Sequence, residues 1–452
     1  MTEAPNNQKA VLVAVQLPTV DDAEFAASLQ ELERLVTTLG YEVVGRVTQS
    51  RDHFSPASVL GEGKLQELAE LTGGTGQVPS AAPKKKDKAR LKRAKEAAQD
   101  GEEDDEEEDD DAPKKAALVA IDHDVSPSQA RNLERATGVQ VLDRTGVIIE
   151  IFHRHAKSRE ARLQVEIARL HYTTPRLRES PSGKERQAGR GSGEAGLELD
   201  RRKVRDRIAE LKEELAAVQR DQDVRRTHRR DARRVALVGY TNAGKSSLMR
   251  GLTGSDVYVE NKLFATLDTT VRALHPEPKP RILVSDTVGF IKKLPHDLVA
   301  SFKSTLDEAL EASHLLHVVD ASDAGWEGQL RVTQDVLAEI GADRVPSTLV
   351  LNKADRLDDA ARAMLARRFP DAWVVSAHDP ADIARVRERL IELFERQYEE
   401  AEITVPYAQQ KLVSEMHEGG LVLEERYDEA GVIVRWKAAP EAVAKLRAKL
   451  VS

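Results

Sequence analysis

The chain has 452 residues, a length typical of roughly two to four domains. Hydrophobic residues make up 40% of the sequence and aromatic residues only 4%, so we expect a helix-rich protein with several apolar cores. The absence of cysteine excludes disulfides and cysteine-ligated zinc. The net charge of −9 comes from one acidic block at 102–111; the remainder is about neutral, with basic clusters at 201–207 and 225–234 that could face nucleic acid.

The N-terminal segment MTEAPNNQKA has no charged-then-apolar signal pattern, and no run approaches about 18 apolar residues. We therefore expect a cytoplasmic protein without a membrane span. Partial association with a membrane stays open, and we expect a monomer.

Residues 1–156 are expected to form an N-terminal α/β domain. AVLVAVQL, YEVVGRVTQ, ALVAID and VQVLD are short apolar runs typical of buried strands. Helices are expected over 21–40, from Lys64 to Leu71, and near Ser126–Thr137. Residues 72–115 interrupt this pattern with a Gly/Ser/Pro-rich stretch followed by basic and acidic blocks. We expect a disordered charged insertion there, with an RNA-touching arm as the alternative.

Residues 157–232 predict an antiparallel helical hairpin. The first helix, over 157–172, places Leu163, Ile167 and Leu170 on one face. The second, over 198–224, carries a heptad seam made of Val204, Ile208, Leu211, Leu215 and Val218. The Gly- and Arg-rich segment between them would be the tip of the hairpin.

Residues 233–398 alternate strands and helices again and predict a doubly wound sheet. Its five expected strands are RVALVG, RILVSD, LLHVVD, TLVLN and AWVVSA. Residues 402–452 predict a small α+β domain, with a helix near Gln409–His417, strands LVLEER and GVIVRW, and a last helix from Pro440.

A P-loop follows the strand RVALVG. It comprises Gly239, Tyr240, Thr241, Asn242, Ala243, Gly244, Lys245 and Ser246, with Ser247 next in the helix it opens. Its glycines let backbone N–H groups surround phosphates, and Lys245 would reach the β- and γ-phosphates. The Ser246 hydroxyl would be a ligand of Mg²⁺.

Three further motifs complete a guanine-nucleotide site. Asp286, Thr287, Val288 and Gly289 end the next strand, where Asp286 would hold Mg²⁺ through water and the Gly289 N–H would meet the γ-phosphate. Asn352, Lys353 and Asp355 follow the strand TLVL, and the Asp355 carboxylate can accept both guanine N1–H and N2–H₂. Ser376 and Ala377 are placed to contact guanine O6.

A threonine between these motifs should complete the Mg²⁺ shell. In the segment Phe264, Ala265, Thr266 we favour Thr266, with Thr269 and Thr270 as alternatives. The metal ligands would then be Ser246 and Thr266.

The residue after Gly289 is Phe290, where many GTPases have a glutamine that orients water. Intrinsic hydrolysis should therefore be slow. Asn242 offers a partial remedy, because an asparagine at this position can hold K⁺ against the phosphates; a simple turn residue is the alternative. We expect Lys245, Asn242 and Gly289 to act in catalysis.

The chain resembles the HflX family of translational GTPases over nearly its whole length outside 72–115. The resemblance is carried by Gly61–Lys64, Ser126–Gln129, Arg131–Glu134, Asp143–Gly146, Glu160–Glu166, Gly193-Glu194, Asp200–Arg202, Gly239–Ser247, Phe264–Thr270, Asp286–Ile291 and Leu316–Ser322. It implies binding of GTP and GDP, and activation by the large ribosomal subunit. It also implies separation of the subunits of stalled ribosomes under stress.

The resemblance further implies that the hairpin tip reaches ribosomal RNA near the peptidyl-transferase centre, here through Arg190, Gly191, Ser192 and Gly193. Ser192 stands where the family usually has a proline. Some family members are also linked to adenine nucleotides at the Gly61–Lys64 region. Two other functions remain open: a ribosome-assembly or RNA-remodelling GTPase, and a regulatory GTPase switch that binds a protein partner.

Overall fold

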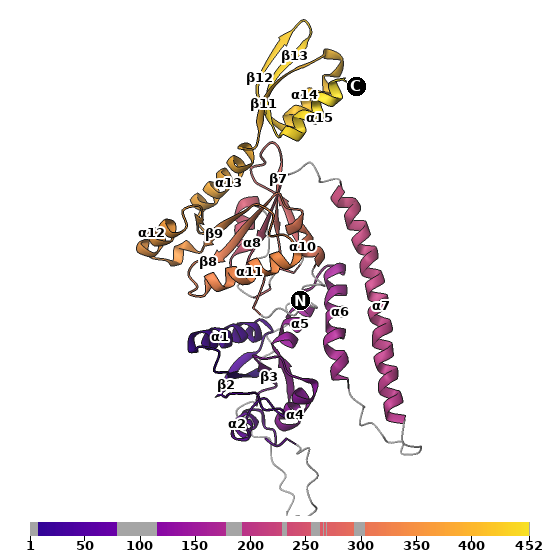
Figure 1. The fold of residues 1–452 in the computed structure, drawn as a ribbon, viewed down its shortest axis with the longest axis vertical. Helices are drawn as coiled ribbons and strands as arrows, with labels where there is room; N and C mark the ends of the chain where they lie inside the picture. Colours follow the sequence, from indigo (N-terminus) through magenta and orange to yellow (C-terminus); the bar gives the residue numbers. More distant parts are fainter. Residues whose placement is uncertain are drawn as a thin grey trace, which may run out of the picture. The chain divides into compact units, whose positions relative to one another are not determined.

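The structure, a computed structural model, describes residues 8–78, 115–177, 192–227, 233–254, 263–264, 266–267, 269–292 and 303–451. It divides into two compact units, Met1–Glu150 and Ile151–Ser452 (Figure 1). The charged insertion at 72–115 falls mostly outside the described residues, so its expected disorder stays a prediction. None of the helices in the described ranges is long and apolar enough to cross a membrane.

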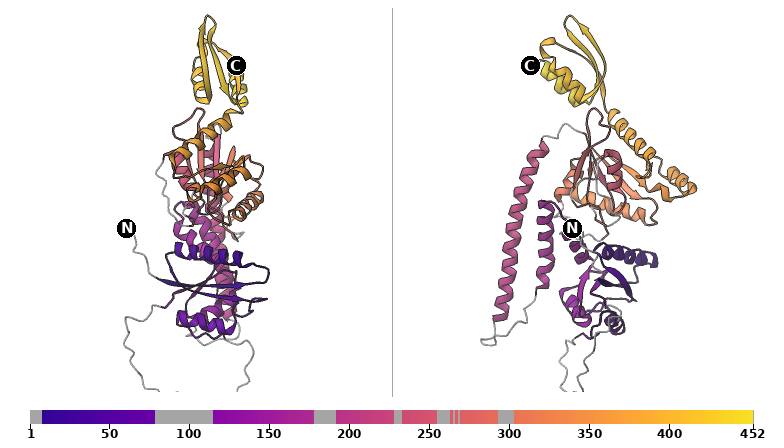
Figure 2. Two further views of the ribbon diagram at one scale, coloured as in Figure 1. Left: turned by 90° about the vertical axis from the view of Figure 1, so that its left-hand side faces the viewer. Right: turned by 180° about the vertical axis from the view of Figure 1, so that it is seen from behind.

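The first unit is an α/β sandwich around a four-stranded parallel sheet with strand order β2-β1-β3-β4. Its strands are β1 (Lys9–Gln16), β2 (Glu42–Ser50), β3 (Leu118–Ile121) and β4 (Gln140–Asp143). Its helices are α1 (Asp22–Thr38), α2 (Glu62–Thr72) and α4 (Pro127–Thr137), and Figure 2 shows them on both faces of the sheet. The strands expected from the apolar runs are all present.

Helix α5 (Arg144–His155) has no counterpart among the elements expected from the sequence. Its run VIIEIF resembles a strand, but Val147, Ile148, Ile151 and Phe152 are all buried and the Asp143 carboxylate accepts the Gly146 N–H at 2.8 Å. Because the helix is buried on more than one face, its apolar residues do not show the one-sided spacing by which an amphipathic helix is recognised in a sequence. The boundary between the two units falls within this helix.

Helices α6 (Arg159–Thr173) and α7 (Ser192–Thr227) form the expected pair. The short 3₁₀ turn η1 (Thr174–Arg176) directly follows α6. The seam packs as predicted, because one apolar cluster contains the following residues of both helices: Leu163, Ile167, Leu170, Val204, Ile208, Leu211, Leu215 and Val218.

The expected tip needs one correction. Ser192 and Gly193 belong to the first turn of α7 rather than to a connecting loop, because α7 begins at Ser192. Arg190 and Gly191 lie outside the described residues.

The nucleotide-binding region contains a six-stranded sheet with strand order β10-β9-β8-β5-β7-β6. The strands are β5 (Arg233–Val238), β6 (Thr270–Ala273), β7 (Ile282–Asp286), β8 (His314–Asp320), β9 (Ser347–Asn352) and β10 (Trp373–Val374). Five of them are parallel and correspond to the five expected strands; β6 is an unexpected edge strand, antiparallel to β7. Its four residues are at best half-buried, so they leave little apolar signal.

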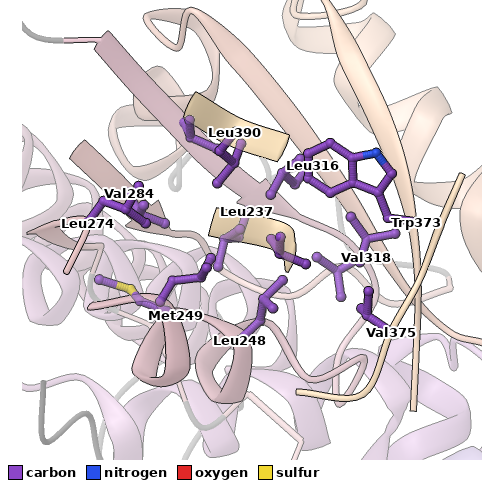
Figure 3. Packing of buried hydrophobic residues seen from close by; sticks show 14 of the residues in the cluster. Leu237, Leu248, Met249, Leu274, Val284, Leu316, Val318, Trp373, Val375 and Leu390 are labelled. Atoms are coloured by element: carbon purple, nitrogen blue, oxygen red, sulfur yellow. The ribbon is translucent and has the colours of Figure 1, made fainter. Parts of the chain in front are cut away.

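Helices cover both faces of this sheet. Around it lie α8 (Lys245–Thr253), α10 (Lys303–Leu310), α11 (Trp326–Ile340), the 3₁₀ turn η2 (Ala354–Arg356), α12 (Asp359–Arg368) and α13 (Pro380–Glu395). Figure 3 shows one core, in which Leu248 and Met249 of α8 and Leu390 of α13 pack on Leu237, Leu316 and Val318. This core fixes the strand ends that carry the nucleotide motifs.

The C-terminal region is a three-stranded antiparallel sheet with two helices, as the expected α+β domain requires. It comprises β11 (Glu399–Val405), the 3₁₀ turn η3 (Tyr407–Gln409), α14 (Lys411–Gly419), β12 (Gly420–Asp428), β13 (Gly431–Ala438) and α15 (Pro440–Val451). Strand β11 was not among the expected elements. Trp436 anchors this core and donates its indole N–H to the Met416 carbonyl at 2.8 Å.

Candidate nucleotide-binding site

The P-loop connects β5 to α8, as the motif requires. Lys245 is buried, and its ammonium donates to the carbonyls of Gly239 and Tyr240 at 3.1 and 2.9 Å. Burial lowers the pKa of Lys245 to about 8, and the nearby Asp286 carboxylate opposes this shift. A phosphate anion beside this ammonium would favour its charged form, so the lysine is prepared for a negatively charged ligand.

Three oxygen-bearing side chains meet at the start of α8. The Ser246 hydroxyl donates to Asp286 Oδ2 at 2.6 Å, and the Thr266 hydroxyl donates to the same oxygen at 3.2 Å. The Ser246 and Thr266 hydroxyl oxygens are 2.8 Å apart. The structure thus brings Thr266, the favoured of the three candidate threonines, to the expected metal ligand Ser246.

This oxygen cluster fits a small divalent cation. Asp286 is fully buried, and its Oδ1 atom has no hydrogen-bond partner among the described residues. Burial raises the pKa of Asp286, while Lys245 and the two hydroxyls lower it. A buried carboxylate oxygen without a donor, beside two hydroxyls, is a donor set suited to Mg²⁺.

Gly289 lies directly against the P-loop. A Cβ atom at this position would be 2.8 Å from Thr241 Cα and 3.0 Å from Lys245 Nζ, so a side chain would collide with backbone. The Gly289 backbone is therefore next to the lysine that would meet the terminal phosphates. The side chains of Thr287 and Val288 are both buried, and the Thr287 hydroxyl donates to the Leu237 carbonyl at 2.7 Å.

Phe290 is turned away from this site. Its side chain is 2% exposed and packs in a core cluster with Ala236, Val238, Leu306 and their neighbours. The side chain that occupies the position of a water-orienting glutamine is therefore a core residue and cannot activate water.

The guanine-recognition motifs are tied to the P-loop. The Asn352 side chain donates to the Ala243 carbonyl at 2.8 Å and accepts the Ala377 N–H at 3.0 Å. Gly244 has φ +93°, and a Cβ atom there would be 2.2 Å from Asn352 Nδ2, so only glycine permits this approach. Asn352 thus joins the phosphate-binding and base-binding halves of the site.

Asp355 is oriented by Ser376. The Ser376 hydroxyl donates to Asp355 Oδ1 at 2.6 Å, and this bond holds the pKa of Asp355 below its usual value. The carboxylate is therefore ionised and can accept hydrogen bonds from guanine. Lys353 has φ +61° and pairs with Asp320 at 2.7 Å.

Two carboxylates of this site were not among the expected residues. Asp320 ends β8 beside β9, so its place at the carboxyl edge of the sheet was a usable signal. Asp382 of α13 accepts the Ser376 N–H at 2.6 Å. Nothing in the local sequence distinguishes Asp382 from other acidic residues in a first helical turn.

The remaining expected residues are placed as follows. Asn242 is exposed, with φ +60°. Phe264 also has a positive φ, of +56°, and its buried ring meets Phe152 edge-on at a centroid distance of 4.5 Å. Ser247 lies in α8, next to Ser246. Ala265 lies outside the described residues.

Comparison with known proteins identifies the same regions. Residues 234–353 match the family model described as 50S ribosome-binding GTPase. Residues 26–77 and 90–153 match the model for GTP-binding GTPase N-terminal, and residues 155–229 match the model for GTP-binding GTPase Middle Region.

Known proteins match over most or all of the chain. The protein named GTPase HflX from Gluconacetobacter diazotrophicus is 62% identical over 452 residues, covering 100% of both chains. That of Escherichia coli (strain K12) is 35% identical over 434 residues, covering 94% of this chain and 92% of its own. A GTP-binding protein from the archaeon Sulfolobus solfataricus, solved with GDP, is 22% identical, with coverage of 85% and 98% and a TM-score of 0.42.

Proposed function

Because the chain belongs to the HflX family of GTPases, we propose that this GTP-hydrolysing enzyme binds the large ribosomal subunit and uses GTP to separate stalled ribosomes. The observation that carries the proposal is a buried Phe290 in an otherwise equipped nucleotide site. Such a site binds GTP but lacks a side chain that activates water. It therefore suits an enzyme whose hydrolysis is triggered by a partner.

Different residues of the site would bind the γ-phosphate, the guanine base and the metal ion. The Gly289 N–H and the Lys245 ammonium would contact the γ-phosphate, and Asp355, held by Ser376, would select guanine. Mg²⁺ would be held by Ser246 and Thr266, with Asp286 behind them; when bound, it neutralises charge on the β- and γ-phosphates. Asn242 is exposed, and no described side chain bonds to it, so its amide oxygen is available to K⁺.

The hairpin offers a surface for ribosomal RNA. Arg201 and Arg205 of α7 are exposed, and no described carboxylate pairs with either of them. Arginines of this kind suit an RNA backbone, because a guanidinium binds phosphate in a bidentate manner. We place the RNA-contacting end of the hairpin at the start of α7, with Arg190, Gly191, Ser192 and Gly193.

Light scattering of intact ribosomes tests the proposal. Addition of the full-length protein with GTP should lower the scattering as subunits separate, whereas GDP should leave it unchanged. Unchanged scattering despite binding to large subunits would instead favour ribosome assembly or RNA remodelling.

A paired charge reversal locates the contact. Arg201→Glu with Arg205→Glu should reduce splitting at least about tenfold, because each lost phosphate contact weakens RNA binding. Lys212→Glu with Arg220→Glu makes the same charge change further along the same helix, where both side chains are also exposed, and serves as the control. Equal loss in both variants would mean that net charge, not this end of α7, controls binding.

A further inference from the structure

A tyrosine of the P-loop reaches across to the segment that follows Gly289. Tyr240 is 5% exposed, and its hydroxyl oxygen accepts the backbone N–H of Lys292 at 2.6 Å. Position 240 therefore joins two parts of the site that are 52 residues apart in sequence.

Backbone hydrogen bonds surround this contact. The Phe290 N–H donates to the Gly239 carbonyl at 3.1 Å, and the Thr241 N–H donates to the Phe290 carbonyl at 2.8 Å. Together they form a parallel bridge between Tyr240 and Phe290. Three hydrogen bonds thus hold Phe290 and Lys292 against Gly239, Tyr240 and Thr241.

Gly289 is fixed by its position beside this bridge. Its backbone is pressed against Thr241 and Lys245, whereas the neighbouring Phe290 side chain is buried in the core. One attachment therefore has two effects: it holds the Gly289 amide at the phosphate end of the P-loop and keeps residue 290 out of the site.

We propose that Tyr240 is a positioning residue for GTP, which holds the segment Asp286–Lys292 in register with the P-loop so that the Gly289 N–H is ready to bind the γ-phosphate. The hydroxyl provides the outermost of the three hydrogen bonds, two residues beyond Phe290. Tyr240 acts through Gly289 and does not itself contact the nucleotide through this hydroxyl.

This role affects GTP and GDP differently. Only GTP presents a γ-phosphate to Gly289, so loosening the segment weakens the contact made by GTP and leaves the contacts of GDP in place. A purely structural role in the P-loop would weaken both nucleotides to the same extent.

The test is Tyr240→Phe in the full chain, which removes one oxygen atom and keeps the ring in its buried place. We expect the affinity for a non-hydrolysable GTP analogue to fall about fivefold to tenfold, the usual effect of losing one hydrogen bond, while the affinity for GDP changes by less than about twofold. The kcat of GTP hydrolysis should fall with the affinity for the analogue.

Tyr407→Phe is the matched control. The Tyr407 hydroxyl also bonds to backbone, donating to the Asp428 carbonyl at 2.8 Å, but it lies in the C-terminal sheet region and is 49% exposed. Its removal should leave both affinities unchanged. The proposal is overturned if Tyr240→Phe leaves the GTP-analogue affinity unchanged, or lowers both affinities equally together with the melting temperature.

Discussion

Asp382 should control guanine-nucleotide affinity although it lies behind the base-binding residues. Its carboxylate is 7% exposed and accepts the Ser376 N–H at 2.6 Å, and it also pairs with Arg385. Ser376 in turn directs its hydroxyl to Asp355. Asp382→Ala would thus remove the anchor of the loop that orients the guanine-selecting carboxylate.

The size of the effect follows from the lost bond. A hydrogen bond to a charged acceptor contributes about 1.5–3 kcal/mol, and the mutation also leaves the buried Ser376 N–H without its acceptor. If roughly half of this cost falls on binding, the affinity drops about tenfold, since about 1.4 kcal/mol corresponds to one factor of ten. The affinities for GDP and for GTP should fall by the same factor, because the mutation perturbs the residues that bind the guanine base and not those that bind the phosphates.

Titration of fluorescent GDP and of a GTP analogue measures both affinities. Asp382→Asn keeps an acceptor oxygen and should recover most of the affinity. Asp359→Ala is the control, since Asp359 is also in the first turn of a helix of this region but is fully exposed. Binding of GDP by Asp382→Ala within about twofold of the original would refute the proposed chain from Asp382 to Asp355.

Three further outcomes are expected. Asp355→Asn should weaken GDP at least about 100-fold and favour xanthine nucleotides, because the amide places a donor where guanine N2–H₂ also donates; unchanged base preference in competition titrations would contradict this. Burial, with a contribution from His314, lowers the pKa of His317 to about 4. Between about pH 6.5 and pH 4, His317 is therefore protonated in the unfolded chain but neutral in the native protein. This contribution to stability is complete above about pH 6.5 and falls by about 2 kcal/mol by pH 5; His317→Leu should make thermal unfolding less sensitive to pH over that window, and an unaltered pH slope would contradict the assignment. Replacing K⁺ by Na⁺ should slow GTP hydrolysis, and Asn242→Ala should abolish the difference; a cation effect that survives in this variant would exclude Asn242 as its source.

Local patterns made much of the fold predictable. Most of the parallel strands are buried apolar runs, β2 with its single buried residue Val47 being an exception, and the seam of α7 is visible as heptad spacing; both signals lie within one segment of sequence. Strand β11 also had such a signal, because Ala401, Ile403 and Val405 alternate as buried residues in EEAEITV. Helix α5 had none, since its β-branched run becomes helical through tertiary burial.

The sequence predicted those residues of the nucleotide site that belong to short contiguous motifs. Lys245 and Asp355 follow parallel strands of one sheet and Asp286 ends another, so their convergence at one edge follows from the topology. The sequence favoured Thr266 among three threonines, but the anchor Asp382 and the contact from Tyr240 to Lys292 were not predictable in the same way. Each depends on which distant side chain or amide comes within hydrogen-bond distance after folding.

Cosedimentation with purified large ribosomal subunits tests the central claim most directly. The full-length protein should pellet with the subunits in the presence of a non-hydrolysable GTP analogue and remain largely in the supernatant with GDP. Failure to pellet in both nucleotide states would contradict a ribosomal function and favour a GTPase switch that binds a protein partner.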